Sequence, residues 1–292
     1  MREEEVHVKL GFLTAVLNDL PWKEVCRIGR EAGYQALELG MWTWSKHASP
    51  TEILGGQGRE MKALAAEHGL MISALTCHIN HLQPDAAERE ALNQHFGQVI
   101  RCAAALEVPV VTALSAVPLS DLDEAANWKA FCGVMGGHLS RAADGGVKIA
   151  IENFPPLLTH NIPTLERLFN ELPRDNLGLN YDPSHFLWQQ VDYLEVVRRF
   201  GKKIFHSHAK DTEIRRHVLA REGVRGKDWW RFRLPGFGEV DWKALLSAYR
   251  EVGYDYVMSF EHEDPLFGAE EGVRRMGPWL RNLAGPEGHG KK

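Results

Sequence analysis

Short apolar runs alternate along the whole chain with longer stretches in which apolar residues recur every three or four positions. Short runs bounded by Gly, Pro or Asn are typical of buried strands, and the longer spacing is typical of helices with one buried face. Eight strands are predicted, at residues 6–12, 36–40, 71–78, 108–115, 148–153, 177–185, 204–211 and 255–264.

Helical segments are predicted between these strands and after the last one, at residues 21–33, 58–69, 91–108, 128–146, 162–173, 191–201, 240–253 and 268–285. Several end in Gly or Pro just before the next strand, as helices that lead into strands do. Eight strand–helix repeats in 292 residues predict a (β/α)₈ barrel, with one domain spanning residues 1–292. A doubly wound open sheet uses the same alternation, but its usual Gly-rich turn is absent after the first predicted strand.

Ionisable residues stand at the ends of the last four predicted strands. In a barrel, alternate residues of each strand point toward the axis. In KIAIEN (148–153) the two isoleucines then point outward to the helices, and Glu152 points inward. The same parity places Asp182, His208 and Glu261 inward on the next three strands. The four side chains are therefore expected to meet at the carboxyl end of the barrel, where the active sites of this fold lie.

Three carboxylates in one partly buried site require a cation or protons to neutralise them. A divalent metal ion held by the three carboxylates and the histidine is the simplest solution. This oxygen-rich set suits Mn²⁺ best, with Mg²⁺, Co²⁺ and Zn²⁺ as alternatives. We therefore predict one divalent metal ion as the cofactor.

The seventh predicted strand carries further polar residues. Its parity sends Phe205 outward and His206 inward, one layer below His208, so we interpret His206 as a hydrogen-bonded core residue. Lys210 has two interpretations. It either contacts substrate oxygens, with Asp211 orienting it, or belongs to a solvent-facing ion pair.

The composition narrows the class of protein. The chain is 44% hydrophobic and 25% charged, as is ordinary for a soluble globular protein, and its net charge of −5 offers no basic field for nucleic acid. Its 4 cysteines lack disulfide or zinc-ribbon spacing, which favours a reduced, cytoplasmic setting. No signal peptide and no membrane span are expected, because the N-terminus lacks an apolar core and no long apolar run occurs.

The motifs IAIENF, NYDPSH, HSHAKD, LPGFGEVDW and SFEHED occur in this order. On these motifs the whole chain resembles the sugar phosphate isomerase/epimerase family of xylose isomerase-like TIM barrels. The resemblance implies one metal ion bound by Glu152, Asp182, His208 and Glu261. It also implies that His185, of the Asp-x-x-His pair, touches substrate oxygens. Dimers and tetramers are common in the family, so a homodimer or homotetramer is compatible with the resemblance, and the sequence leaves the oligomeric state open.

The chemistry implied by the resemblance is that of an enzyme, a sugar isomerase or epimerase of carbohydrate metabolism that acts on a small-molecule substrate. The metal would bridge a substrate carbonyl and its neighbouring hydroxyl and stabilise the enediolate formed when the proton between them leaves. Glu152 and Glu261 would act as the acid/base pair.

Further substrate contacts are expected around this site. His78 ends the third predicted strand and would lie at the mouth of the barrel. Arg231 or Arg233 could reach in, as an arginine does in related ketohexose epimerases, but the spacing from His208 is longer here and leaves the choice open. The tryptophans of MWTWSKH (41–47) could stack on a sugar or pack as a roof over the barrel.

Other functions compatible with the resemblance use the same barrel. A lyase or dehydratase, such as an inosose dehydratase or a 3-keto-glycoside lyase, would use the same metal and base to expel a β-substituent, and the long insertion at residues 217–236 could hold a bulkier substrate. Apurinic endonucleases share the Asp-x-x-His signature but carry an Asp-Arg-His element that is not found here. A non-catalytic barrel would be expected to have lost ligands, and all four are present.

Overall fold

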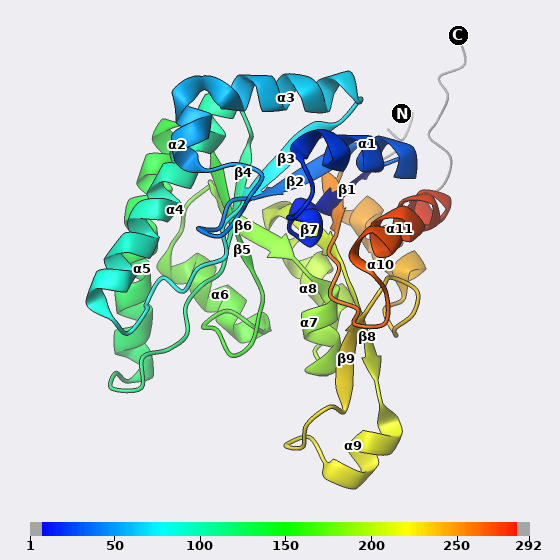
Figure 1. Cartoon of the computed structure of the whole chain (residues 1–292). Coiled ribbons are helices and arrows are strands. Elements are labelled where there is room, and N and C mark those ends of the chain that lie inside the picture. The colour runs from blue at the N-terminus through cyan, green and yellow to red at the C-terminus, as the bar shows by residue number, and fades with distance from the viewer. Residues whose placement is uncertain (1–7, 285–292) are drawn as a thin grey trace, which may run out of the picture.

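Eight parallel strands close into a barrel surrounded by helices in the computed structural model, which describes residues 8–284 (Figure 1). The predicted (β/α)₈ fold is confirmed, and each predicted strand overlaps one barrel strand. Residues 1–7 and 285–292, which the predicted domain and its terminal elements include, lie outside the described part. The barrel strands are β1 (Lys9–Leu13), β2 (Ala36–Gly40), β3 (Met71–Thr76), β4 (Val110–Ala113), β5 (Lys148–Glu152), β6 (Leu177–Tyr181), β7 (Ile204–Ala209) and β10 (Val257–Phe260).

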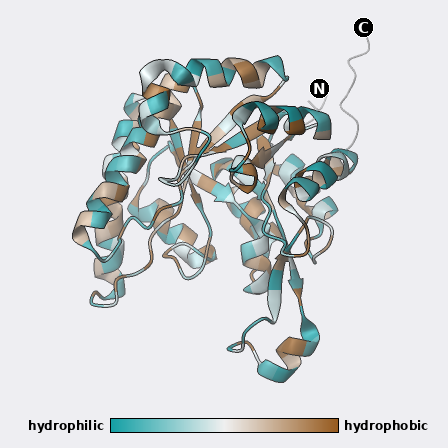
Figure 2. Cartoon of the chain, viewed as in Figure 1, coloured by the Kyte–Doolittle hydropathy of each residue, from teal (hydrophilic) through white to brown (hydrophobic). Residues whose placement is uncertain are grey.

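Helices follow the strands, and eight of them overlap predicted segments. The helices at residues 50–52, 183–188 and 216–222 were not predicted, and the second of these covers the end of the sixth predicted strand. The helices are α1 (Trp22–Ala32), α2 (Pro50–Glu52), α3 (Gly58–Glu67), α4 (Ala86–Leu106), α5 (Glu124–Asp144), α6 (Ile162–Glu171), α7 (Pro183–Trp188), α8 (Tyr193–Phe200), α9 (Arg216–Glu222), α10 (Trp242–Val252) and α11 (Ala269–Ala284). Helices α4 and α5 begin earlier than predicted, because the side chains of Asp85 and Asp123 cap their first turns. Hydrophobic residues gather on the barrel strands, and the outer turns of the helices are largely hydrophilic (Figure 2). Within residues 8–284, no helix has the length and apolar character needed to cross a membrane.

The outward prediction for Phe205 is wrong. In the pairing of β6 with β7, Leu179 lies opposite Ile204 and Asn180 lies opposite His206, so Phe205 is an extra residue in a β-bulge. Its ring packs inside the barrel, with the apolar layer that includes Ala150, instead of against the helices. The bulge lets two successive residues of β7 face inward.

A hairpin projects from the barrel after β7 (Figure 1). Its strands β8 (Asp211–Ile214) and β9 (Trp230–Arg233) pair antiparallel, and α9 lies between them. The indole of Trp230 stacks on Trp188 of α7, with ring centroids 4.5 Å apart. This stacking holds the hairpin against the helix that follows β6.

Candidate metal centre

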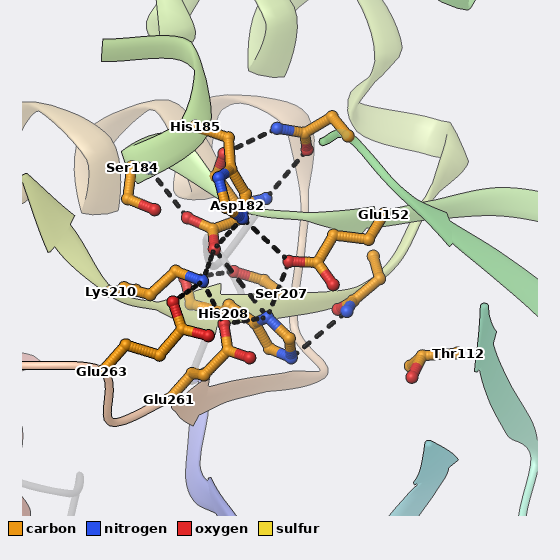
Figure 3. Close-up of polar contacts among 12 residues, drawn as sticks. Thr112, Glu152, Asp182, Ser184, His185, Ser207, His208, Lys210, Glu261 and Glu263 are labelled. Atoms are coloured by element: carbon orange, nitrogen blue, oxygen red, sulfur yellow. Dashed lines mark hydrogen bonds and ion pairs between the residues drawn. The ribbon is translucent and has the colours of Figure 1, made fainter. Parts of the chain in front are cut away.

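Four ionisable side chains meet at the carboxyl end of the barrel (Figure 3). Glu152 ends β5, Asp182 follows β6, His208 lies in β7 and Glu261 follows β10. One possible ligand atom from each lies within 4.8 Å of the others, and all four residues are buried. The structure therefore brings together the four residues that strand parity selected.

The arrangement fits a cation. His208 Nδ1 lies 3.3 Å from Glu152 Oε1 and 3.1 Å from Glu261 Oε2. His208 Nδ1 and Asp182 Oδ2 are both buried, and neither makes a hydrogen bond, although charged groups lie 3.1 to 3.3 Å from each. Buried polar atoms in folded proteins normally make hydrogen bonds, so two such atoms among three carboxylates fit a binding site for a positive ion.

A buried layer lies directly below and includes Glu38, which the sequence analysis missed. Both carboxylate oxygens of Glu38 lie 3.1 Å from His208 Nε2. In the same layer, His206 bonds through its two ring nitrogens to Asn180 Oδ1 at 3.1 Å and Ser73 Oγ at 3.2 Å. Glu38, His206 and His208 are also close enough to form a metal-ligand group, but their contacts are those of a hydrogen-bonded layer. The parity of β2 carried the signal for Glu38, because the glutamate stands between two outward leucines.

The Asp-x-x-His pair is brought together by the first turn of α7. Asp182 precedes this helix and accepts a hydrogen bond from the Ser184 backbone N–H, which places His185 one turn further on. His185 Nε2 then lies 3.3 Å from both Asp182 Oδ2 and Glu152 Oε1. The rings of Phe154 and Phe232 meet the imidazole edge to face, so His185 is held at the wall of the site.

Lys210 is buried in the site, which excludes the solvent-facing alternative. Its Nζ lies 2.6 Å from Glu261 Oε2 and 3.3 Å from both Asp182 Oδ2 and Glu263 Oε2. The ammonium also lies 4.4 Å from the centre of the Phe232 ring. Glu263 and Phe232 were not singled out from the sequence, although Glu263 shares the inward parity of Glu261.

Asp211 does not orient the lysine before it. Its carboxylate accepts hydrogen bonds from the backbone N–H groups of Thr212, Gly236 and Val240, and from the indole of Trp242. These contacts tie the segment that follows the hairpin to the barrel. Asp211 is therefore a structural residue of the loop, and the orienting role predicted for it is wrong.

The two arginines of β9 turn to Glu213 on the neighbouring strand. Arg231 Nε donates to Glu213 Oε2 at 2.7 Å, and Arg233 donates to the same oxygen at 2.6 Å and to Asp264 at 2.8 Å. Alternate residues of a strand face opposite sides, so Phe232 between them faces His185 and Lys210. The side chain that this strand presents to the site is an aromatic ring, whereas an arginine was expected.

His78 lies beside the candidate ligands. Its Nδ1 is 3.3 Å from Glu152 Oε2, and its Nε2 is 3.1 Å from the Thr112 hydroxyl. The indole of Trp42 donates to the His78 backbone carbonyl and stacks on Trp44. The two tryptophans line a cavity of 260 Å³ together with Glu261, Glu263 and the apolar Leu13 and Val16. The tryptophans of the second loop thus line a cavity that reaches Glu261.

The acidic surroundings control the basic groups of the site. Burial by itself would lower the pKa of His208, but the carboxylates of Glu261, Glu38 and Glu152 outweigh burial and raise that pKa well above its usual range. The pKa of Lys210 is raised in the same way, against burial, by its carboxylate partners. Without a metal ion, protons on these groups neutralise part of the acidic charge.

The carboxylates respond in the opposite direction. Burial would raise the pKa of Glu261, but Lys210 and His208 lower it to about 2. Burial would also raise the pKa of Glu152, but His208 and His78 outweigh burial and hold that pKa well below the usual range. Both glutamates are therefore ionised at neutral pH, as a proton-accepting or metal-binding group must be.

Comparison with known proteins places this chain in a family. The chain is 28% identical to the uncharacterized Bacillus subtilis protein YfiH, over 91% of this chain and 96% of that one. It is 32% identical to an inosose isomerase of the same organism over 134 residues, which are 44% of this chain and 46% of that protein. A crystal structure of the IOLI protein with a bound zinc atom superposes with a TM-score of 0.74 and 25% identity, covering 95% of this chain and 98% of that one. Residues 26–283 match the family model, so the chain belongs to the xylose isomerase-like TIM barrel family.

Proposed function

We propose that this protein is a divalent-metal-dependent isomerase or epimerase of a small polyhydroxy ketone. The observation that carries the proposal is the convergence of Glu152, Asp182, His208 and Glu261, whose buried atoms include a nitrogen and an oxygen that make no hydrogen bond. Three carboxylates and one imidazole favour Mn²⁺, and the zinc atom of the IOLI structure makes Zn²⁺ the second ion to test.

Proton transfer next to a carbonyl is the reaction that this site supports best. A divalent ion held there would polarise the carbonyl and stabilise the negative charge that develops as the neighbouring proton leaves. Glu152 and Glu261 belong to β5 and to the end of β10, and β6 and β7 separate these strands in the barrel. The two carboxylates thus approach a bound molecule from different directions. One ionised glutamate removes the proton. The other returns a proton to the opposite face or to the next carbon after taking it up from its neighbour, which is Lys210 for Glu261 and His78 for Glu152.

Neighbouring side chains prepare this pair and bind the substrate. His78 contacts Glu152 and Lys210 contacts Glu261, so each glutamate has its own basic partner. The Lys210 ammonium and the His185 ring lie within 3.3 Å of the carboxylate oxygens of the centre, which places them within reach of substrate oxygens. We assign substrate binding to His185, Lys210 and His78.

The charge of the site favours a substrate without phosphate. Lys210 is already shared among three carboxylates, and Arg233 is held by two others on the hairpin. A phosphate would have to compete with those carboxylates for each cation, whereas hydroxyl groups can accept and donate in the existing network. A cyclic keto-polyol such as the inosose named for the relative meets this requirement.

The test is an exchange experiment in deuterated buffer with added Mn²⁺. Inosose and a panel of keto-sugars are incubated with the protein and followed by NMR for deuterium at the carbon next to the carbonyl. We expect exchange together with formation of an isomer, and a loss of about 10²- to 10⁴-fold in Glu152→Gln and Glu261→Gln. Tyr249→Phe is the control. The hydrogen bond described for the Tyr249 hydroxyl goes to Ser207, which lies on the outer face of β7.

Each other outcome has a distinct meaning. Loss of water or of another leaving group from the substrate would identify a lyase instead of an isomerase. A protein that retains no divalent ion and shows the same exchange when Glu152 is replaced would overturn the proposal. Tight Mn²⁺ binding without exchange in any ketone of the panel would contradict the catalytic role.

A further inference from the structure

Glu38 has a fully buried carboxylate and is not one of the four candidate ligands. It lies in β2, on the opposite side of the barrel from β6, and its side chain enters the layer below the metal centre. A buried anion is costly unless it is paired and hydrogen-bonded. The contacts of Glu38 therefore indicate what the residue does.

The main partner of Glu38 is the ring of His208. Both carboxylate oxygens lie 3.1 Å from His208 Nε2, and the Thr76 hydroxyl donates to Oε1 at 2.5 Å. Carboxylate oxygens can only accept, so Nε2 carries a hydrogen. Nδ1 lies 3.3 Å from Glu152 and 3.1 Å from Glu261 and also carries a hydrogen while no cation is bound. A metal ion would take the place of that hydrogen, and the lone pair of the neutral ring would then lie on Nδ1.

Asn180 competes for the same nitrogen. Its Nδ2 lies 3.2 Å from His208 Nε2, and its Oδ1 is already bonded to His206. An amide N–H can only donate, so without the carboxylate it would favour a ring with the hydrogen on Nδ1. That hydrogen would occupy the position of the metal. Glu38 opposes this arrangement because its two oxygens can only accept.

The contacts of Glu38 continue to a second candidate ligand. Thr112 donates to the Thr76 hydroxyl at 2.9 Å and contacts His78 at 3.1 Å, and His78 contacts Glu152. Glu152 in turn lies 3.3 Å from His208 Nδ1, which closes a ring of contacts. The ring consists of six side chains: Glu38, Thr76, Thr112, His78, Glu152 and His208.

We propose that Glu38 is a positioning residue that sets the orientation and the hydrogen position of His208, so that Nδ1 is available to a metal ion. The inference rests on the metal centre of the proposed function. A metal-ligating histidine usually donates its other ring N–H to a carboxylate or carbonyl, and loss of that partner weakens metal binding by about 10- to 100-fold. Glu38 occupies that place, from a strand that contributes no candidate ligand.

The experiment measures metal binding in the absence of substrate. Mn²⁺ and Zn²⁺ affinities are measured by calorimetry for the full chain and for Glu38→Ala and Glu38→Gln, and the visible spectrum of the Co²⁺-loaded protein reports the geometry of the ligands. We expect Glu38→Ala to bind about 10- to 100-fold more weakly with an altered Co²⁺ spectrum. Glu38→Gln keeps one accepting oxygen and is expected to show a smaller loss.

Matched variants separate this role from a general loss of structure. Tyr249→Phe removes the buried hydrogen bond to Ser207 on the outer face of β7, the strand that carries His208. We expect the metal affinity of this variant to be unchanged. If Glu38→Ala does not fold, Thr76→Val removes the hydrogen bond that holds Glu38 Oε1 beside His208, and we expect weaker metal binding there too. Wild-type affinity in the folded Glu38 variants would overturn the inference and leave the metal centre intact. Absence of metal binding in the wild type would instead overturn the proposed function.

Discussion

His206 and His208 lie two residues apart in β7, and both are fully buried inside the barrel. The ring of His206 is satisfied by two neutral partners, Asn180 and Ser73. The ring of His208 contacts Glu38 with one nitrogen, and its other nitrogen makes no hydrogen bond but faces the carboxylates of the metal centre. One strand thus supplies a neutral layer and a charged layer.

The two layers differ in charge because their neighbours differ. Burial lowers the pKa of His206 to about 4, and the attraction of Glu38 does not reverse this. Burial acts on His208 as well, but three carboxylates outweigh it and raise the pKa of that ring. Residue type and burial are therefore insufficient to assign a metal ligand. What distinguishes the candidate ligand His208 from the core residue His206 is a ring nitrogen that makes no hydrogen bond and faces carboxylates.

The strongest test of this contrast exchanges each histidine for asparagine. We expect His208→Asn to weaken Zn²⁺ binding by more than about 100-fold, because loss of a group that only supports a ligand costs about 10- to 100-fold. We expect His206→Asn to keep wild-type affinity. Calorimetric titration of both variants measures the difference, and equal losses would break the distinction between the layers.

The pH dependence of stability sharpens the contrast in the metal-free protein. The folded pKa of His206 is about 4, below the unfolded value of about 6.5, so its contribution to stability is lost as pH falls from about 6.5 to 4. Burial lowers the pKa of His81 to about 4 as well, so it adds to this slope. We expect urea unfolding at a series of pH values to show the loss, and His206→Asn to flatten it by up to about one proton. An unchanged slope would contradict a neutral His206.

A second pH window belongs to the charged layer. The folded pKa of Glu261 is about 2, below the unfolded value of about 4.3, so its contribution is present above about pH 4.3 and is lost as pH falls toward 2. Glu261→Gln is expected to reduce the loss in this window.

The smallest expected effect comes from Ser73→Ala. This change removes one partner of the His206 ring and leaves a buried nitrogen unpaired, which costs about 1–3 kcal/mol of unfolding free energy. Metal affinity should not change, because the hydrogen bonds described for the Ser73 hydroxyl go to Leu37 and His206 and to none of the four candidate ligands. Denaturant unfolding and calorimetry together check both expectations. A weaker metal affinity would show that the lower layer also supports the centre through His206.

The errors of the sequence analysis have a common physical origin. Phe205 was assigned to the wrong face because the bulge in β7 depends on its pairing with β6. The role of Asp211 was misjudged because its partners lie 25 residues or more further along the chain, except for Thr212. The direction of Arg231 and Arg233 depends on how β9 pairs with β8, which the local pattern does not specify.

Periodicity in the sequence by itself determined the eight strands, the helices between them and the inward parity of Glu152, Asp182, His208 and Glu261. Parity is a local property, because side chains alternate along a regular strand, and it failed only where the bulge at Phe205 interrupts the alternation. Only the tertiary structure decided which inward groups are paired and which are left unpaired. It placed Glu38 under His208 and Phe232 over Lys210 by bringing distant strands together. Hydrogen-bond pairing and burial are properties of these distant contacts, and they separate the candidate ligand His208 from the core residue His206.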